Sequence, residues 1–152
     1  MFFDGTFRKN FIKINLANNK LYLRRRLVQK IEFLGEIISK KLTSGENVMI
    51  VPSIVGYYPI FERQAPMYDT YPVYPGTLDD QKNMLESIVN NNVKLCVINN
   101  IDLDNNENLR FQYTYPLIWK YLNSHFKVLD YQNIDPNYIL FERIGLTSIT
   151  EK

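Results

Sequence analysis

The chain has 152 residues, which fits one domain, and a chain of this length buries roughly 70% of the surface that it exposes when unfolded. Its hydrophobic fraction of 45% and charged fraction of 22% are ordinary for a globular protein and exclude a disordered or fibrous chain. A net charge of +2 gives no indication of nucleic acid as a partner, and no apolar run approaches the roughly 20 residues that span a bilayer, so we expect a soluble chain.

The first predicted element is a β-hairpin over residues 11–23. Ile12, Ile14 and Leu16 alternate with polar residues, as they do in a half-buried strand. Asn18-Asn19 tolerates the positive φ of a tight turn, and Leu21-Tyr22-Leu23 can then return as the second strand.

A long amphipathic helix is predicted from Arg24 to Leu42, because apolar residues recur along it at intervals of three and four. Its first residues, Arg24-Arg25-Arg26, are candidates for binding a phosphate or a lipid headgroup. Three basic residues fall short of the about four to eight that mark segments binding anionic membranes. The run alone therefore favours a solvated first turn.

The stretch Asn47–Gly76 contains the best candidate for a recognition surface. Val48–Val51 is short and rich in β-branched residues, which predicts a buried strand that Pro52 ends. The segment Ile54–Gly76, called here the Tyr/Pro segment, carries five tyrosines and four prolines. Because loops at the carboxyl ends of strands form the ligand crevice of open α/β sheets, we expect this segment to recognise a ligand or a partner.

The side chains of the Tyr/Pro segment allow two interpretations. Its tyrosines could stack on sugar rings or pack the segment against its own domain, and both interpretations stay open; they are Tyr57, Tyr58, Tyr68, Tyr71 and Tyr74. Glu62 and Asp69 are candidates for acid–base chemistry, and pairing with Arg63 or capping a local turn would equally explain them.

A second helix is predicted to begin at Thr77, where Asp80 completes a variant of the capping box. Val93–Ile98 follows as another fully buried strand, and we expect it to lie parallel to Val48–Val51 and next to it at the centre of the sheet. Asn99–Asn108 is polar and is expected to be a loop. It resembles the start of a calcium loop, but a glutamate stands where that loop needs glycine and a tyrosine where it needs its last glutamate, so calcium is not expected.

The C-terminal part is predicted to contain a third helix, Phe111–Ser124, and a hairpin of Val128–Tyr131 with Tyr138–Phe141. The alternation of helices and strands predicts an α/β fold with a mostly parallel sheet flanked by helices, a Rossmann-like three-layer arrangement. The N-terminal β-hairpin and an antiparallel C-terminal edge hairpin complete it. Residues 1–10 are expected to be a lead-in, 11–144 a single domain and 145–152 a flexible tail.

The sequence contains no self-contained catalytic apparatus. His125 is the only histidine and Cys96 the only cysteine, so the usual zinc ligand sets are missing, and no nucleophile–histidine pair has a local signature. Cys96 lies in an apolar run, which predicts a buried, inert thiol. The strand ending at Val51 is not followed by the spaced glycines of a dinucleotide or phosphate loop. We therefore expect no metal and no cofactor.

The order of motifs resembles the soluble C-terminal domain of polytopic, lipid-linked-sugar glycosyltransferases, the group similar to protein mannosyltransferases and aminoarabinose transferases. The resemblance covers roughly residues 12–143. Its motifs are Val48–Pro52, Tyr57-Tyr58, Arg63, Pro66-Met67-Tyr68-Asp69, Pro75-Gly76-Thr77-Leu78-Asp79-Asp80-Gln81, Arg110-Phe111, Tyr115-Pro116-Leu117, Tyr121-Leu122 and Tyr138–Arg143. Glu62 departs from the pattern, because a glycine often precedes the arginine in that group.

The resemblance implies a non-catalytic, extracytoplasmic domain. In such enzymes the acidic catalytic residue lies in a loop of the transmembrane portion, so no catalytic residue can be assigned to this chain. The expected partners are that transmembrane portion and a lipid-linked sugar or glycan acceptor, with no nucleic acid. The resemblance adds Arg63 to the candidate binding residues, which are then Tyr57, Tyr58, Arg63, Tyr68, Asp69, Tyr71 and Tyr74.

Two other functions stay open. The chain could be a free-standing α/β binding or interaction protein without enzymatic activity. It could also be a small hydrolase or transferase that uses Glu62 or Asp69. The donor sugar, the acceptor and the oligomeric state do not follow from the residues.

Overall fold

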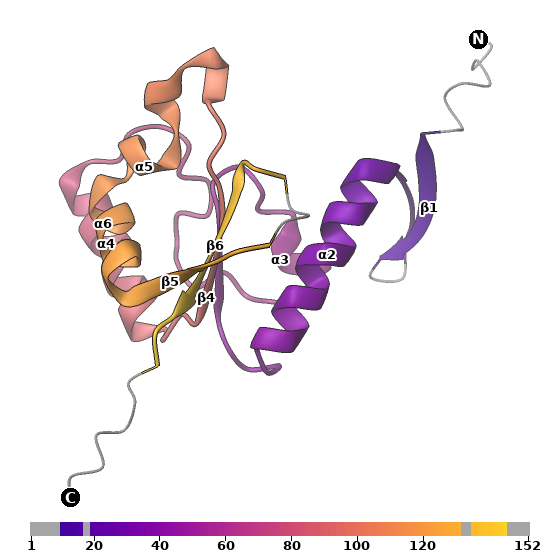
Figure 1. The fold of residues 1–152 in the computed structure, drawn as a ribbon, viewed down its shortest axis with the longest axis horizontal. Coiled ribbons are helices and arrows are strands. Elements are labelled where there is room, and N and C mark those ends of the chain that lie inside the picture. The colour runs from indigo at the N-terminus through magenta and orange to yellow at the C-terminus, as the bar shows by residue number, and fades with distance from the viewer. Residues whose placement is uncertain (1–9, 17–18, 132–134, 146–152) are drawn as a thin grey trace, which may run out of the picture.

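A computed structural model describes residues 10–16, 19–131 and 135–145 of the chain. Figure 1 shows three layers, with a central sheet between α2 on one side and α4, α5 and α6 on the other. The elements in chain order are β1 Phe11–Leu16, β2 Asn19–Arg24, α2 Arg25–Lys41, β3 Val48–Val51, α3 Tyr57–Ile60, α4 Leu78–Asn90, β4 Leu95–Asn99, the 3-10 turns η1 Leu103–Asn105 and η2 Glu107–Leu109, α5 Phe111–Thr114, α6 Pro116–His125, β5 Phe126–Leu129 and β6 Tyr138–Arg143.

The central sheet is a mixed sheet with the strand order β3-β4-β6-β5. β3 and β4 are parallel, with Ile50 opposite Val97, whereas β6 pairs antiparallel with both β4 and β5. The chain is thus α/β as predicted, but among the described strands only one pairing is parallel, so the prediction of a mostly parallel sheet is wrong. The reason is that β6, the second strand of the C-terminal hairpin, pairs with β4, so β6 lies inside the sheet and β5 forms the edge opposite β3.

Both faces of the sheet are covered. Side chains of successive strand residues point to opposite faces, and each set enters its own core cluster. The cluster on the α2 side includes Val48, Ile50, Leu95, Val97 and Leu140. The cluster on the side of α4 and α6 includes Met49, Val51, Cys96, Ile98 and Phe141. The prediction of two strands buried on both faces is confirmed, and burial raises the pKa of the Cys96 thiol, as expected for an inert group.

β3 lies at one end of the strand order, so the prediction that it occupies the centre of the sheet is wrong, whereas its parallel pairing with β4 is confirmed. All four of its residues are nevertheless fully buried. The beginning of the Tyr/Pro segment covers this edge, because Tyr57 and Tyr58 of α3 belong to the same core cluster as Ile50. The Ile50 N–H donates to the Tyr58 hydroxyl at 2.8 Å, so an edge amide finds a partner without a neighbouring strand.

The predicted N-terminal hairpin is confirmed. β1 and β2 form a separate two-stranded antiparallel sheet in which Ile12 lies opposite Leu23 and Lys13 opposite Tyr22. The hairpin contacts α2 and lies on the side of this helix that faces away from the central sheet (Figure 1). Residues 1–9 of the expected lead-in and 146–152 of the expected tail lie outside the described residues.

The predicted helices α2 and α4 are confirmed, and α4 begins with the expected capping box. The Asp80 N–H donates to Thr77 Oγ1 at 3.2 Å, and the Thr77 N–H donates to Asp80 Oδ2 at 2.9 Å. The hydrogen bonds from Thr77 lower the pKa of the Asp80 carboxyl. The third predicted helix is divided into α5 and α6 at Tyr115, because Pro116 disfavours a helical residue before it and has no N–H to donate.

The predicted loop between β4 and α5 folds into the two short turns η1 and η2. Across the described residues, no three His, Cys, Asp or Glu side chains gather in a group that could hold a metal ion. None of the helices in this part of the chain combines the length and the apolar character that crossing a bilayer requires.

Replacing Ile50 by alanine is expected to lower the free energy of unfolding by about 2–4 kcal/mol, since the side chain is fully buried against α2, and Val97→Ala by somewhat less. Denaturant unfolding followed by circular dichroism measures both. Val89→Ala, at a half-exposed position of α4, is the control and should change stability by less than about 0.5 kcal/mol. An Ile50→Ala effect no larger than that of the control would contradict the assignment of this strand to the core.

Candidate functional site

The first half of the Tyr/Pro segment is structural. Tyr57 and Tyr58 are only 6% and 5% exposed. Their hydroxyl groups have partners inside the domain: that of Tyr57 lies 3.5 Å from the Tyr138 hydroxyl, and that of Tyr58 accepts the Ile50 N–H. For these two predicted binding residues, the interpretation that the tyrosines pack against their own domain is therefore the one that fits the structure.

The end of α3 explains Glu62 and Arg63. The Arg63 N–H donates to the Tyr58 carbonyl and the Glu62 N–H to the Pro59 carbonyl, the two hydrogen bonds of a Schellman motif. Glu62 has a φ of 52° in this motif, the left-handed conformation that glycine adopts most easily. The Arg63 guanidinium donates to the carbonyls of Thr43 and Glu46. Arg63 thus ties α3 to the loop between α2 and β3.

The second half of the segment carries three exposed tyrosines. Tyr68 is fully exposed, and Tyr71 and Tyr74 are 56% and 60% exposed. The Tyr74 hydroxyl donates to Asp104 at 3.4 Å, which places this side chain beside η1. We call Tyr68, Tyr71 and Tyr74 the exposed tyrosine surface. The alternative in which the segment buries all of its tyrosines does not hold for these three.

The backbone that carries the exposed tyrosine surface is anchored at three points. Asn91 Nδ2 donates to the Pro66 carbonyl at 2.7 Å, the Tyr115 hydroxyl donates to Asp69 Oδ2 at 3.3 Å, and Gln81 Nε2 donates to the Gly76 carbonyl at 3.1 Å. Gln81 lies in α4, Asn91 directly follows α4, and Tyr115 lies between α5 and α6. The exposed rings therefore stand on a fixed scaffold.

Gly76 is required by the close approach of Tyr115. A Cβ atom at position 76 would lie 2.8 Å from the ring of Tyr115, closer than side-chain contacts allow. The ring itself is buried and stacks on Phe111 with 5.3 Å between the ring centroids, so it cannot move away easily. Burial and the neighbouring Asp69 carboxylate both raise the pKa of the Tyr115 hydroxyl, which keeps it a hydrogen-bond donor to that carboxylate.

A groove of about 330 Å³ lies between the Tyr/Pro segment and α4. Its lining combines an aromatic ring, two carboxylates, an amide, a hydroxyl and two thioethers, from Met67, Tyr68, Asp69, Asp80, Asn83, Met84 and Ser87. The volume is at the lower end of small-molecule sites, which are about 300–1,000 Å³. An exposed aromatic ring beside oxygen acceptors suits a small hydroxylated ring, because the ring stacks and the acceptors bind hydroxyl groups.

The sequence interpretation missed a polar cluster at the carboxyl end of β4. Asn100 is buried, and its side-chain Nδ2 donates to Gln112 Oε1 at 3.2 Å. Its main-chain carbonyl accepts a hydrogen bond from the Arg110 guanidinium, which also pairs with Glu107. Asn100 Oδ1 is buried and has no hydrogen-bond partner within the described residues. The signal in the sequence is the pair Asn99-Asn100 directly after the predicted strand Val93–Ile98, whereas the resemblance to a calcium loop rests on the acidic residues beyond this pair.

His125 is the last residue of α6. Its ring stacks on Tyr121, with 4.2 Å between the centroids, and its Nδ1 lies 3.0 Å from the Tyr121 carbonyl oxygen. This position is in the C-terminal turn of α6, where a basic side chain suits the negative end of the helix dipole.

Tyr58→Phe is expected to lower the free energy of unfolding by about 1–3 kcal/mol, because it leaves the buried Ile50 N–H without an acceptor. Thermal and denaturant unfolding measure the change. Tyr71→Phe is the matched control, since this hydroxyl belongs to a side chain that is 56% exposed, and it should leave stability unchanged. Equal stability of both variants would show that the hydroxyl of Tyr58 does not close the sheet edge.

The structure thus brings Tyr68 and Asp69 together at one groove, keeps Tyr71 and Tyr74 exposed on the same segment, and assigns Tyr57, Tyr58 and Arg63 to the scaffold. The arrangement can bind a small hydroxylated ligand or a protein surface. No family model, no curated protein and no solved structure matches this chain.

Proposed function

We propose that this chain is a non-catalytic, extracytoplasmic domain of a membrane glycosyltransferase that uses a polyprenyl-phosphate-linked sugar. In this proposal the exposed tyrosine surface packs on the transmembrane portion and helps to shape access for the donor or acceptor. The observation that carries it is the exposed position of Tyr68, Tyr71 and Tyr74 on an anchored segment, with Tyr68 lining a groove of about 330 Å³. A Rossmann-like relationship of the fold belongs to the same proposal.

Exposed aromatic rings on a fixed backbone support a role in an interface. Tyrosine is enriched in protein interfaces because its ring offers a large contact area and its hydroxyl remains able to hydrogen-bond. Pro66, Pro72 and Pro75 restrict the backbone on either side of the rings. Since this conformation is set before binding, docking loses less conformational entropy.

The groove supports recognition of a sugar. Tyr68 lies at the groove, beside the carboxylate of Asp69 and the amide of Asn83. Asp69 Oδ1 accepts the Tyr71 N–H at 3.0 Å and Oδ2 accepts the Tyr115 hydroxyl, which fixes the carboxylate in one orientation. A carboxylate oxygen has two lone pairs, so both oxygens can still accept hydroxyl groups of a ligand.

The same contacts support the absence of catalysis by this chain alone. Glu62 occupies the left-handed position that ends α3, and both oxygens of Asp69 already hold structural donors. The only histidine is stacked on Tyr121 at the end of α6. Neither acidic residue is paired with a nucleophile or a histidine in the contacts of the described residues.

The alternative is a free-standing α/β binding protein, which would use the same exposed tyrosine surface. The DNA immediately upstream of the codon for Met1 distinguishes the two functions. A continuous reading frame with many apolar segments ahead of Met1 supports the glycosyltransferase domain. A stop codon and a start site there would support the free-standing protein.

Tyr68→Ala is expected to weaken binding of short oligosaccharides to this chain about three- to ten-fold, because the exposed ring of the groove is lost. Chemical-shift titration by NMR measures the affinity and maps the perturbed residues. Tyr113→Ala is the matched control, since Tyr113 is an exposed tyrosine as well, at 56%, but lies in α5. Equal affinities of both variants, or shifts that avoid the groove, would contradict a sugar site at Tyr68.

The purified chain is expected to transfer no sugar from a polyprenyl-phosphate donor to any acceptor, since Glu62 and Asp69 are not paired with a nucleophile or a histidine in the contacts of the described residues. The measurement is product formation from a radiolabelled donor over hours at high protein concentration. Turnover that disappears in Asp69→Asn or Glu62→Gln would refute the non-catalytic role and favour the small transferase considered above.

A further inference from the structure

The charges of the chain are segregated. Six of its 18 basic residues and none of its 16 acidic residues lie between Asn10 and Ile31, which leaves 12 basic against 16 acidic residues elsewhere. This stretch comprises the hairpin and the first turns of α2, and the structure describes all of it except residues 17 and 18. The small net charge is therefore the sum of a basic segment and of a remainder in which acidic residues outnumber basic ones.

The hairpin register gathers the basic residues of β1 and β2 on one face. Residues opposite each other in an antiparallel pair share a face, and the faces alternate along the strands. Lys13 lies opposite Tyr22, Asn15 opposite Lys20 and Phe11 opposite Arg24, whereas the apolar pairs of Ile12 with Leu23 and Ile14 with Leu21 alternate with them. One face of the hairpin is therefore basic and aromatic, and its opposite face is aliphatic.

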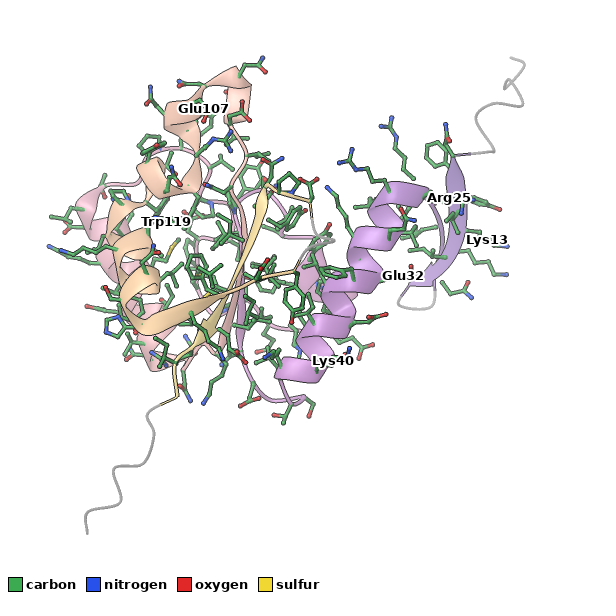
Figure 2. All side chains as sticks on the ribbon, in the orientation of Figure 1. Lys13, Arg25, Glu32, Lys40, Glu107 and Trp119 are labelled. Carbon is green, nitrogen blue, oxygen red and sulfur yellow. The ribbon has the colours of Figure 1, made fainter. Side chains whose placement is uncertain are left out.

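The start of α2 extends this surface. Arg24, Arg25 and Arg26 are exposed, and Figure 2 shows Lys13 and Arg25 at the same end of the molecule, away from the central sheet. Among these side chains, Arg26 pairs with Asp135 at 3.4 Å and remains 81% exposed. We call Lys13, Lys20, Tyr22, Arg24, Arg25 and Arg26 the basic hairpin surface.

This placement of arginines is unfavourable for the helix itself. The amino end of a helix carries a partial positive charge and prefers acidic residues and a side-chain cap. α2 begins without either, since Arg24 makes no capping hydrogen bond and the first turn has no acidic residue. α4 of the same chain has both, with Thr77 as cap and Asp79 and Asp80 in its first turn. α3, α5 and α6 also begin without a side-chain cap or an acidic residue in the first turn, so the two arginines of its first turn are what distinguish the start of α2.

We propose that the basic hairpin surface docks the chain on the anionic phospholipid headgroups of a bilayer. Its five basic residues, with Lys30 behind them, fall within the range of about four to eight that binds acidic membranes, which Arg24-Arg25-Arg26 alone did not reach. The hairpin projects beyond α2 (Figure 1), so a flat surface can approach it while the acidic remainder of the chain stays distant. This proposal rests on the charges and on the exposed apolar side chains near them, and it does not require the proposed function.

Exposed apolar side chains of the hairpin and of the first turn of α2 favour a bilayer over a nucleic acid. Tyr22 on the basic face is 64% exposed, Leu21 on the opposite, aliphatic face is 39% exposed, and Leu27 in the first turn of α2 is 36% exposed. Transfer of such side chains from water into the boundary between headgroups and acyl chains lowers the free energy. A nucleic acid could stack a base on the tyrosine ring, but it would not bury the two leucine side chains in an apolar environment.

The test is co-sedimentation of the full chain with vesicles of phosphatidylcholine alone and of phosphatidylcholine mixed with phosphatidylserine. Binding is expected only to the mixed vesicles and should weaken as salt is raised. Because each basic residue near such a surface contributes about a five-fold change in affinity, the combined variant Lys13→Gln, Lys20→Gln and Arg24→Gln should bind about 100-fold more weakly. The combined variant Lys40→Gln, Lys82→Gln and Lys120→Gln removes the same charge from exposed positions elsewhere and should bind nearly as well as the natural chain.

Circular dichroism of the hairpin variant checks that it is folded, and the salt dependence of the natural chain provides a readout that needs no variant. Equal binding to both kinds of vesicle, binding that salt does not weaken, or equal losses in the two combined variants would overturn the proposal. Fluorescence anisotropy with single- and double-stranded oligonucleotides completes the test. Tighter binding to either oligonucleotide than to the mixed vesicles would assign the surface to nucleic acid instead.

Discussion

The hydrogen bond from the Ile50 amide to the Tyr58 hydroxyl is the constraint on which the arrangement of this chain depends. β3 is the outermost strand of the central sheet, yet it is as apolar and as fully buried as an interior strand. An open edge of this kind would expose its amides and attract other strands. The chain solves the problem with the residues that follow β3, since α3 turns back over the edge and Tyr58 supplies the missing acceptor.

That solution divides the Tyr/Pro segment into two parts with different roles. Tyr57, Tyr58 and Arg63 are held by the core and by the loop after α2, and Glu62 adopts the backbone conformation that lets α3 end there. Beyond Pro66 the chain no longer needs to cover the sheet, and its tyrosines face solvent while Asn91, Tyr115 and Gln81 hold the backbone. Rings placed in this way are available to a ligand without the loss of entropy that ordering a loose loop would require.

Local patterns of the sequence predicted most elements but not their order in the sheet. The N-terminal hairpin, α2, the capping box of α4 and the two buried strands follow from short-range periodicity and capping chemistry, so they could be recognised from the residues alone. The mixed sheet could not, because the insertion of β6 beside β4 depends on long-range pairing that no local signal encodes. Which tyrosines are buried and which are exposed could not be predicted from the sequence either, since it depends on which part of the Tyr/Pro segment covers β3. The basic hairpin surface needed the register of β1 and β2 before its charges could be placed on one face.

Native-state hydrogen exchange, measured residue by residue over positions 48–76, tests the division of the Tyr/Pro segment most directly. The amide of Ile50 is expected to exchange only through global unfolding, because its acceptor is a buried side chain. The amides of Tyr71 and Val73, whose acceptors lie on the exposed segment itself, should exchange through local opening and become slower when a ligand binds. Rapid exchange at Ile50, or one common free energy of opening across the whole segment, would contradict this account.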